Sequence, residues 1–205
     1  NAIAFRDRAE GPTGGEHLLV QGNYKGRLSA WGGQVDLYDA QNNYRGSHYF
    51  SPRISPMMRF LHVSEIMYHP PKPPAGSPYQ DEDFEFIELC NIYTSPLNIT
   101  GAYFSAGITF AFGPDTKPIP PNGACIVLVK NLDAFASRYD TNHMVIAGTF
   151  SGKLSNSGDL IETMDPRNEP IQSFRYDASW YPETDGGGFS LESSDVRGPL
   201  TNWAI

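Results

Sequence analysis

Residues 148–165 read GTFSGKLSNSGDLIETMD, and residues 22–39 read GNYKGRLSAWGGQVDLYD. At this fixed offset of 126 residues (148 − 22), six of the eighteen positions carry the same amino acid. Unrelated segments of this length would share about one position. The repetition predicts that one structural unit occurs twice in the chain, at least in part. The identical pairs are Gly22/Gly148, Gly26/Gly152, Leu28/Leu154, Ser29/Ser155, Gly32/Gly158 and Asp39/Asp165.

The second copy has the pattern of a short helix followed by strands. Leu132, Phe135 and Tyr139 lie at helical spacing, which predicts one short amphipathic helix. The segments after it alternate between apolar runs of strand length and turns rich in Gly, Pro, Ser and Asn. Strands are predicted at 143–150, 160–165 and 170–177, with turns at 151–159 and 166–169.

More strand-like segments precede the second copy. They are short, rich in β-branched or aromatic residues, and bounded by turn residues, a pattern typical of a β-sandwich or barrel. The chain is therefore predicted to hold one complete module, residues 57–205, after the back half of another module and a linker, residues 1–56. The candidate strands are 61–68, 84–92, 97–105, 108–112 and 124–130.

Five short motifs follow one another along the complete module. They are Glu65-Ile66 followed by Pro70-Pro71, FIEL at Phe86–Leu89 with Asn91, PPNG at Pro120–Gly123, LSNSGD at Leu154–Asp159, and DGGGFSLE at Asp185–Glu192. In this order and spacing the module resembles the lamin tail domain family, in the form found in large exported or surface proteins of bacteria. The resemblance covers about residues 61–195. It implies an immunoglobulin-like β-sandwich, a non-catalytic role in interaction or structural support, and a secreted or cell-surface location.

The first copy departs from the family pattern. It keeps the Leu-Ser turn but has Trp31-Gly32-Gly33 where the complete copy has Ser157-Gly158-Asp159, and it lacks every earlier strand. Half a sandwich leaves an apolar face and an unpaired edge. We expect the remnant to be the end of a tandem array, or else to pair with the complete module or with another chain. Residues 51–60 are expected to be the linker.

Composition and charge restrict the classes of partner. The chain has 205 residues, a net charge of -8, and 15 Lys and Arg against 23 Asp and Glu. Because nucleic-acid affinity rests on basic residues that neutralise phosphates, nucleic acid is an unlikely partner. No apolar run approaches the roughly 18 residues that a membrane span needs. The 20 Gly and 17 Pro residues favour many turns and an all-β fold.

The two cysteines, Cys90 and Cys125, both lie in strand-like runs. Their spacing has no CxxC character, so a metal site is not expected. They could form a disulfide if neighbouring strands bring them together, which would suit an exported protein. The favoured expectation is two buried thiols that pack as small hydrophobic groups.

Two groups of residues could bind a metal ion, but a purely structural role is the simpler expectation for both. His62 and Glu65 are three residues apart in a predicted strand, so we expect them on opposite faces of the sheet. The acidic loop with Asp81, Glu82, Asp83 and Glu85 could bind Ca²⁺, but it lacks the spacing of an EF-hand. We expect a solvated loop that leads into a strand.

Sequence motifs of catalysis do not assemble. The glycines at 186–188 match neither phosphate-binding motif, there is no GxSxG, and the five histidines are scattered. We therefore expect no enzyme activity, and we assign no catalytic, cofactor-binding or metal-binding residues and no cofactor.

Two functions from different classes follow. The first is a non-catalytic interaction or structural module of a larger exported bacterial protein, whose partner is another protein or a neighbouring domain. The alternative is an accessory module that binds carbohydrate or Ca²⁺ for an enzyme outside this chain. For the alternative, Trp180 and Tyr181 are candidate sugar-stacking residues, and Asp83 is a candidate calcium ligand.

Overall fold

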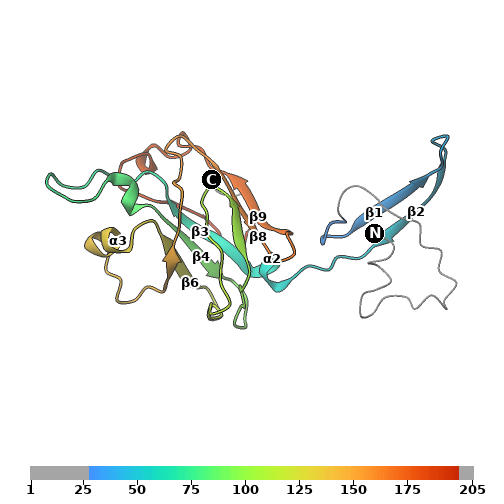
Figure 1. Ribbon diagram of the computed structural model, residues 1–205, viewed down its shortest axis with the longest axis horizontal. Coiled ribbons are helices and arrows are strands. Elements are labelled where there is room, and N and C mark those ends of the chain that lie inside the picture. Colours follow the sequence, from blue (N-terminus) through green and yellow to red (C-terminus); the bar gives the residue numbers. More distant parts are fainter. Residues whose placement is uncertain (1–27, 199–205) are drawn as a thin grey trace. The chain divides into compact units, whose positions relative to one another are not determined.

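The computed structural model of the protein describes residues 28–198. The chain divides into two compact units, Asn1–Arg53 and Ile54–Ile205, called unit 1 and unit 2 below. The described part of unit 1 is one β-hairpin, formed by β1 (Gly33–Tyr38) and β2 (Tyr44–Phe50). Unit 2 consists of two sheets with short helices at their margins (Figure 1). The predicted all-β class is therefore confirmed.

The strands of unit 2 form one sheet of five and one of three. Their orders are β10-β3-β4-β6-β7 and β5-β8-β9. All neighbours are antiparallel except β6 and β7, which are parallel. The bounds are β3 (Leu61–Met67), β4 (Phe86–Asn91), β5 (Tyr103–Ala106), β6 (Ala124–Val129), β7 (Ile146–Thr149), β8 (Leu160–Met164), β9 (Pro170–Arg175) and β10 (Leu191–Glu192).

The core of unit 2 lies where the two sheets face each other. Ile87 and Leu89 of β4 and Leu128 of β6 are fully buried on the inner face of the larger sheet, and Ile161 of β8 is fully buried on the smaller one. A buried hydrogen bond joins the layers, because the Val63 N–H of β3 donates to Gln172 Oε1 of β9 at 2.7 Å. Burying a fully apolar side chain stabilises the fold by about 1.5–3 kcal/mol, so this interface dominates the stability of unit 2.

The predicted helix is present as α3 (Leu132–Arg138), capped by the Asn131 side chain. It packs on the outer face of the larger sheet, where Phe135 meets Phe86 edge-to-face, with ring centroids 5.5 Å apart. A second helix, α2 (Pro56–Phe60), was not predicted, because residues 51–60 were interpreted as a linker. Ser55 caps α2 and Met58 is buried, so this segment is part of unit 2. Two 3₁₀ helices, η1 (Asp81–Phe84) and η2 (Pro182–Thr184), complete the unit.

Two predicted strands are largely loops. Of 97–105 only the end is in β5, and 108–112 forms isolated bridges such as Thr109 with Ser151. Gly101 and Gly107 adopt positive φ angles, of 80° and 89°, which turn the chain out of an extended conformation. The apolar residues in these segments are nevertheless buried, for example Ile99 and Ile108. The apolar residues of these segments resemble those of a strand because they are buried, although the backbone forms no continuous strand there.

The hairpin of unit 1 has the same pairing as the β8–β9 hairpin, shifted by 126 residues. Val35 pairs with His48 as Ile161 pairs with Phe174, and both ladders have a register irregularity at the same place, before Tyr38 and before Met164. This match extends the sequence repeat into backbone geometry. Gly22, Gly26 and the other first-copy residues before Leu28 lie outside the described residues.

The turns of the two hairpins also match. Asp39 Oδ1 accepts the N–H groups of Gln41 and Asn43, and Asp165 Oδ1 accepts those of Arg167 and Glu169. In each turn the asparagine at the equivalent position, Asn42 or Asn168, has a positive φ angle of 63° or 61°. Asn tolerates this conformation better than most residues, which explains its presence in both turns.

The two hairpins differ in burial. Ile161 is 0% exposed, whereas its equivalent Val35 is 44% exposed, and Leu154 is 1% exposed against 50% for Leu28. Leu37, in the next inner-face position of β1, is 65% exposed. Within the described residues, unit 1 thus presents the face that unit 2 buries in its core.

Cys90 of β4 and Cys125 of β6 form a disulfide. They are directly opposite in the β4–β6 ladder, with Cα atoms 4.0 Å apart. The expectation of two free thiols is therefore wrong. Alternation along each strand fixes the face on which a cysteine lies, but only the pairing of β4 with β6 and its register bring the two sulfurs together.

We predict that removing this disulfide destabilises unit 2 by about 3–4 kcal/mol, because it closes a loop of 35 residues in the unfolded chain. The double variant Cys90→Ser, Cys125→Ser should show this loss in urea unfolding followed by tryptophan fluorescence. Adding a reductant should lower the stability of the wild-type protein and leave the double variant unchanged. A loss below about 1 kcal/mol would show that the cross-link contributes little here.

Candidate functional site

A cavity of about 560 Å³ opens at one end of unit 2, beside the start of β4. Three segments form its walls: the residues after β3, η1 with the residue that follows it, and the loop before β8. These segments are distant in sequence but leave the two sheets at the same end. The lining residues are His69, Pro70, Asp81, Glu82, Glu85, Lys153, Leu154, Ser155 and Asn156.

Glu85 is the buried charge of this cavity. Its side chain is 1% exposed, and Oε2 accepts the N–H of Leu154 at 3.0 Å. Its backbone oxygen accepts the N–H of Lys130, so both ends of the residue are fixed. Burial raises the pKa of the Glu85 carboxyl from 4.5 to about 7, although the hydrogen bond from Leu154 and the charges of Lys130 and Lys153 oppose the rise.

The rim of the cavity carries paired charges. Lys153 Nζ lies 3.6 Å from Glu82 Oε2, and both side chains are largely exposed. His69 Nδ1 lies 2.6 Å from Asp185 Oδ1, which brings the loop after β3 to the glycine-rich loop 185–188. The rim thus joins loops from several parts of the chain.

The wall beside Ser155 is held by Tyr176, the residue that follows β9. The Tyr176 hydroxyl donates to the Ser155 backbone oxygen at 2.7 Å, and burial raises the pKa of this hydroxyl strongly, with the Asp159 and Glu85 charges adding to the rise. Its ring packs against Tyr68 with centroids 4.8 Å apart. The loop Lys153–Asn156 is therefore anchored to the core on both sides, by Glu85 and by Tyr176.

Among residues 28–198, the carboxylates of the acidic loop do not converge into a group of three potential metal ligands. Asp83 accepts the Gln80 N–H at 2.8 Å and faces Asn131 at 3.4 Å, and it does not line the cavity. Over residues 28–198, the group of three potential ligands whose atoms all lie within 4.8 Å of one another is a different one, Glu88 with Cys90 and Cys125. The acidic loop was predicted to lead into a strand. It contains η1, which ends at Phe84, and β4 begins at Phe86.

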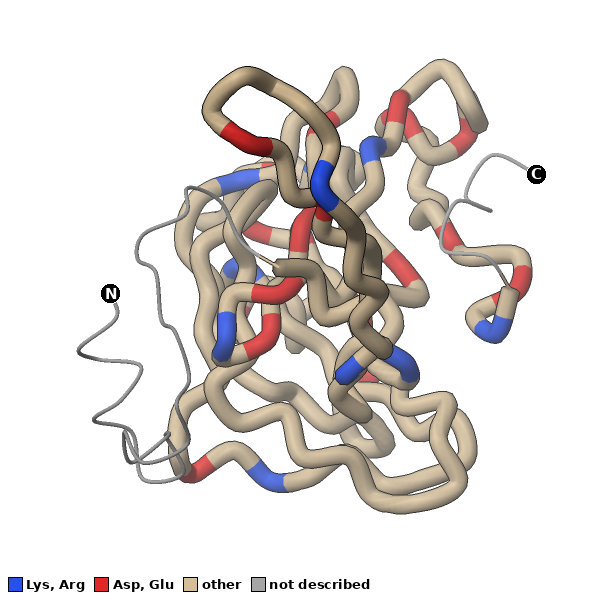
Figure 2. The backbone as a smooth tube through the Cα atoms, turned by 90° about the vertical axis from the view of Figure 1, so that its right-hand side faces the viewer, with Lys and Arg blue, Asp and Glu red and all other residues tan. Residues whose placement is uncertain are grey.

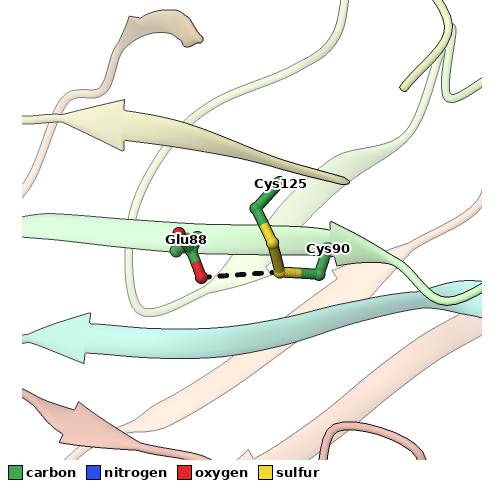
Figure 3. Close-up of side chains that lie close together, drawn as sticks. All are labelled: Glu88, Cys90 and Cys125. Atoms are coloured by element: carbon green, nitrogen blue, oxygen red, sulfur yellow. Dashed lines mark hydrogen bonds between the residues drawn. A yellow bond between two sulfur atoms is a disulfide. The ribbon is translucent and has the colours of Figure 1, made fainter. Parts of the chain in front are cut away.

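Glu88, Cys90 and Cys125 lie together on the outer face of the larger sheet (Figure 3). Glu88 Oε1 is 3.4 Å from Cys90 Sγ and accepts the Ser64 hydroxyl at 2.7 Å. Because the two sulfurs are joined in a disulfide, they are not thiolate ligands in this state. The group is a structural cross-link rather than a metal centre.

The expectation that His62 and Glu65 lie on opposite faces is wrong. Their partners in the ladder are Cys90 and Glu88, which share a face of β4, and the β3–β4 register shifts between Val63 and Glu65. This β-bulge adds one residue, Ser64, and so restores the shared face. Burial raises the pKa of Glu65 and lowers that of His62.

The candidate sugar-stacking residues do not line the cavity. Trp180 and Tyr181 are half-buried in the segment between β9 and η2. The Tyr181 backbone oxygen accepts the Thr184 hydroxyl at 2.8 Å, as part of the turn into η2.

Sequence reasoning grouped Glu85 with the acidic loop and missed its separate environment. One signal was available, since Glu85 lies between Phe84 and Phe86 in a strand-like run. Alternation puts Glu85 on the face opposite to both rings. The partner of Glu85, the Leu154 N–H, is 69 residues away and could not be inferred from the local pattern.

Lys and Arg do not gather in one region of the described chain. Figure 2 shows short blue segments scattered among more numerous red ones. This pattern agrees with the low count of basic residues in the sequence. In the part of the chain that the structure describes, no helix is long and apolar enough to cross a membrane.

We predict that Glu85→Gln reduces the pH dependence of stability. Since the folded pKa of Glu85 is raised above its unfolded value, the stability that protonation provides is full at low pH and is lost as pH rises through about 7. The wild-type protein should therefore lose about 2–3 kcal/mol between about pH 4.5 and pH 8 that the variant does not lose. Urea unfolding of both proteins across this range measures the difference.

The control for this experiment is Glu162→Gln, on the outer face of the three-stranded sheet, which removes the same charge outside the cavity. It should leave the pH profile as in the wild type. Parallel profiles for Glu85→Gln and the wild type would contradict the assigned burial of a titrating carboxyl.

Comparison with known proteins adds no relative: no protein-family model, curated protein or solved structure matches the chain.

Proposed function

We propose that the chain is a non-catalytic interaction and support module of the lamin tail type, built on an immunoglobulin-like sandwich and carried by a larger exported bacterial protein. Such sandwiches consist of two antiparallel sheets packed face to face, and the two sheets of unit 2, in which every pair except β6–β7 is antiparallel, support this assignment. The sequence motifs Glu65-Ile66 and LSNSGD support the family. The cross-strand disulfide supports export, since disulfides persist in oxidising compartments.

The observation that carries the proposal is the hairpin of unit 1. It repeats the pairing and turn of β8–β9, yet Val35 and Leu37 on its inner face are exposed. Exposed apolar faces of this kind mark protein interaction surfaces. We therefore assign unit 1 to the end of a preceding copy in a tandem array.

The equivalent hairpin defines what a partner must supply. β8 pairs on its outer edge with β5, and the inner face of β8–β9 packs on the larger sheet. A partner of β1–β2 would add an antiparallel strand to β1 and an apolar sheet to the face with Val35 and Leu37. A preceding sandwich provides both, and exchange between two chains would satisfy the same requirement through self-association.

The alternative is an accessory ligand-binding module, which the cavity beside Glu85 favours. Neither ligand class expected from the sequence suits this cavity. The lining includes no Trp, Tyr or Phe side chain on which a sugar ring could stack. Its carboxylates are also not among the described groups that converge closely enough for a cation such as Ca²⁺.

We predict that supplying the missing sandwich protects the hairpin. In a chimera, residues 54–147 are placed directly before residue 22, which reproduces the order found in the second copy. Backbone amides of residues 34–38 should then exchange with deuterium at least about tenfold more slowly than in the original chain, because a covered hairpin must open before it exchanges. Hydrogen-exchange mass spectrometry measures the rates.

A matched pair of variants tests the face involved. Leu37→Asp, on the inner face, should abolish the protection in the chimera, whereas Gln34→Asp, on the outer face of the same strand, should preserve it. If the amides of β1 exchange equally fast in the chain and in a folded chimera, the assignment of unit 1 to a preceding sandwich is wrong.

A further inference from the structure

The inner face of the unit 1 hairpin carries a titratable group that the equivalent face of unit 2 lacks. His48 stands directly opposite Val35 in the β1–β2 ladder. At the same place in the β8–β9 ladder, Phe174 stands opposite Ile161. Because residues directly opposite each other in an antiparallel ladder project from the same face, the His48 side chain shares the apolar face with Val35. The first copy thus has an imidazole where the second has a phenyl ring.

The two equivalent positions differ in burial. Phe174 is 7% exposed, and the helix α2 and the strand β3 lie against its strand β9. His48 is exposed. A module that covers the hairpin of unit 1 as unit 2 covers β8–β9 would enclose His48 in the same way. Since burial disfavours the charged form of an ionisable group, such a module accepts the neutral imidazole and opposes the protonated one.

The hairpin itself offers no carboxylate to stabilise a protonated His48 on this face. The residues two positions away along β2, which share its face, are Gly46 and Phe50. A carboxylate would have to lie within about 4–6 Å to favour the charged imidazole. The other ionisable side chains of the hairpin are Asp36 and Tyr49 on the opposite face, and Tyr38, Asp39, Tyr44 and Arg45 at the end with the turn.

The elements that cover β8–β9 in unit 2 offer no carboxylate on their inner side either. The ionisable residue of α2 is Arg59, whose positive charge would oppose an imidazolium. In the described strands of the larger sheet, the ionisable side chains other than the disulfide cysteines share the outer face, as the ladder partners show. They are His62, Glu65, Glu88 and Glu192.

We propose that the contact between the unit 1 hairpin and the larger sheet of a preceding module is released by acid, through protonation of His48. This inference rests on the proposed function of unit 1 as the end of a tandem copy. An imidazole in water takes up a proton at about pH 6.5. The open hairpin allows this protonation and the covered hairpin opposes it, so covering is strongest above about pH 6.5 and weakens as the pH falls below that value.

The first test uses the chimera described above, with residues 54–147 placed before residue 22. Deuterium exchange of the amides of residues 34–38 is measured at pH 7.5 and pH 5.5, and each rate is divided by that of the unstructured chain at the same pH. We expect about tenfold less protection at pH 5.5. His48→Phe, which recreates the residue at position 174, should reduce this change to less than about twofold. His143→Gln, at an exposed position, should retain the tenfold loss.

The second test uses the full chain and makes the reverse exchange. Phe174→His places an imidazole at the covered position of unit 2, and Phe174→Leu removes the ring without adding a titratable group. Urea unfolding is followed by tryptophan fluorescence at both pH values. Between pH 7.5 and pH 5.5, the unfolding equilibrium constant of Phe174→His should rise about tenfold relative to that of Phe174→Leu, which should follow the wild-type pH profile.

The outcomes separate this inference from the proposed function. If the amides of a folded chimera are protected equally at both pH values, acid release is wrong and the assignment of unit 1 to a preceding module stands. If they are unprotected at pH 7.5 in both the chimera and its His48→Phe variant, both proposals are wrong. Identical pH profiles for Phe174→His and Phe174→Leu would also overturn acid release. Each test decides alone if the protein used in the other does not fold.

Discussion

The structure of unit 2 depends on the burial of one hairpin face against the larger sheet. A two-stranded hairpin is only marginally stable in water, so β8–β9 needs this contact to persist. Ile161 and Phe174 supply apolar area, and Gln172 adds a hydrogen bond to the β3 backbone. The same dependence explains unit 1, where an equivalent hairpin shows Val35 and Leu37 to solvent. An exposed apolar face of this kind needs a partner that covers it, and the proposed interaction role is based on this need.

Buried polar groups fix the loops that the core cannot hold. The side chain of Asn91 is fully buried. Its Nδ2 donates to the backbone oxygens of Ser95, Ile119 and Pro120, and its Oδ1 accepts the Tyr93 N–H, so both polar atoms of the amide have partners. Glu85 acts in the same way, because its Oε2 accepts the Leu154 N–H and its backbone oxygen accepts the Lys130 N–H. Two loops that are distant in sequence are thereby held beside the start of β4.

The hairpin of unit 1 and the cavity of unit 2 are different surfaces with different chemistry. The hairpin would recognise a protein through backbone pairing and apolar burial, whereas the cavity is lined mainly by charged and polar residues. If the chain is an accessory ligand-binding module, the lining of this cavity argues against the two ligands expected from the sequence, because it suits neither a stacked sugar nor a calcium ion. Both functions could operate in one chain, since a module in a tandem array can hold its neighbours through one surface and capture a ligand through another.

The sequence by itself determined the local elements: the α3 helix from Leu132 and Phe135, and both hairpins with their matching turns at Asp39 and Asp165. Helical spacing, strand alternation and turn chemistry act between residues a few positions apart, so they can be inferred from the order of amino acids. Tertiary structure alone decided the Cys90–Cys125 disulfide, the bulge at Ser64, and the burial of Glu85 beside Leu154. Each depends on which strands become neighbours and in what register, and that choice is made by packing between segments far apart in the chain.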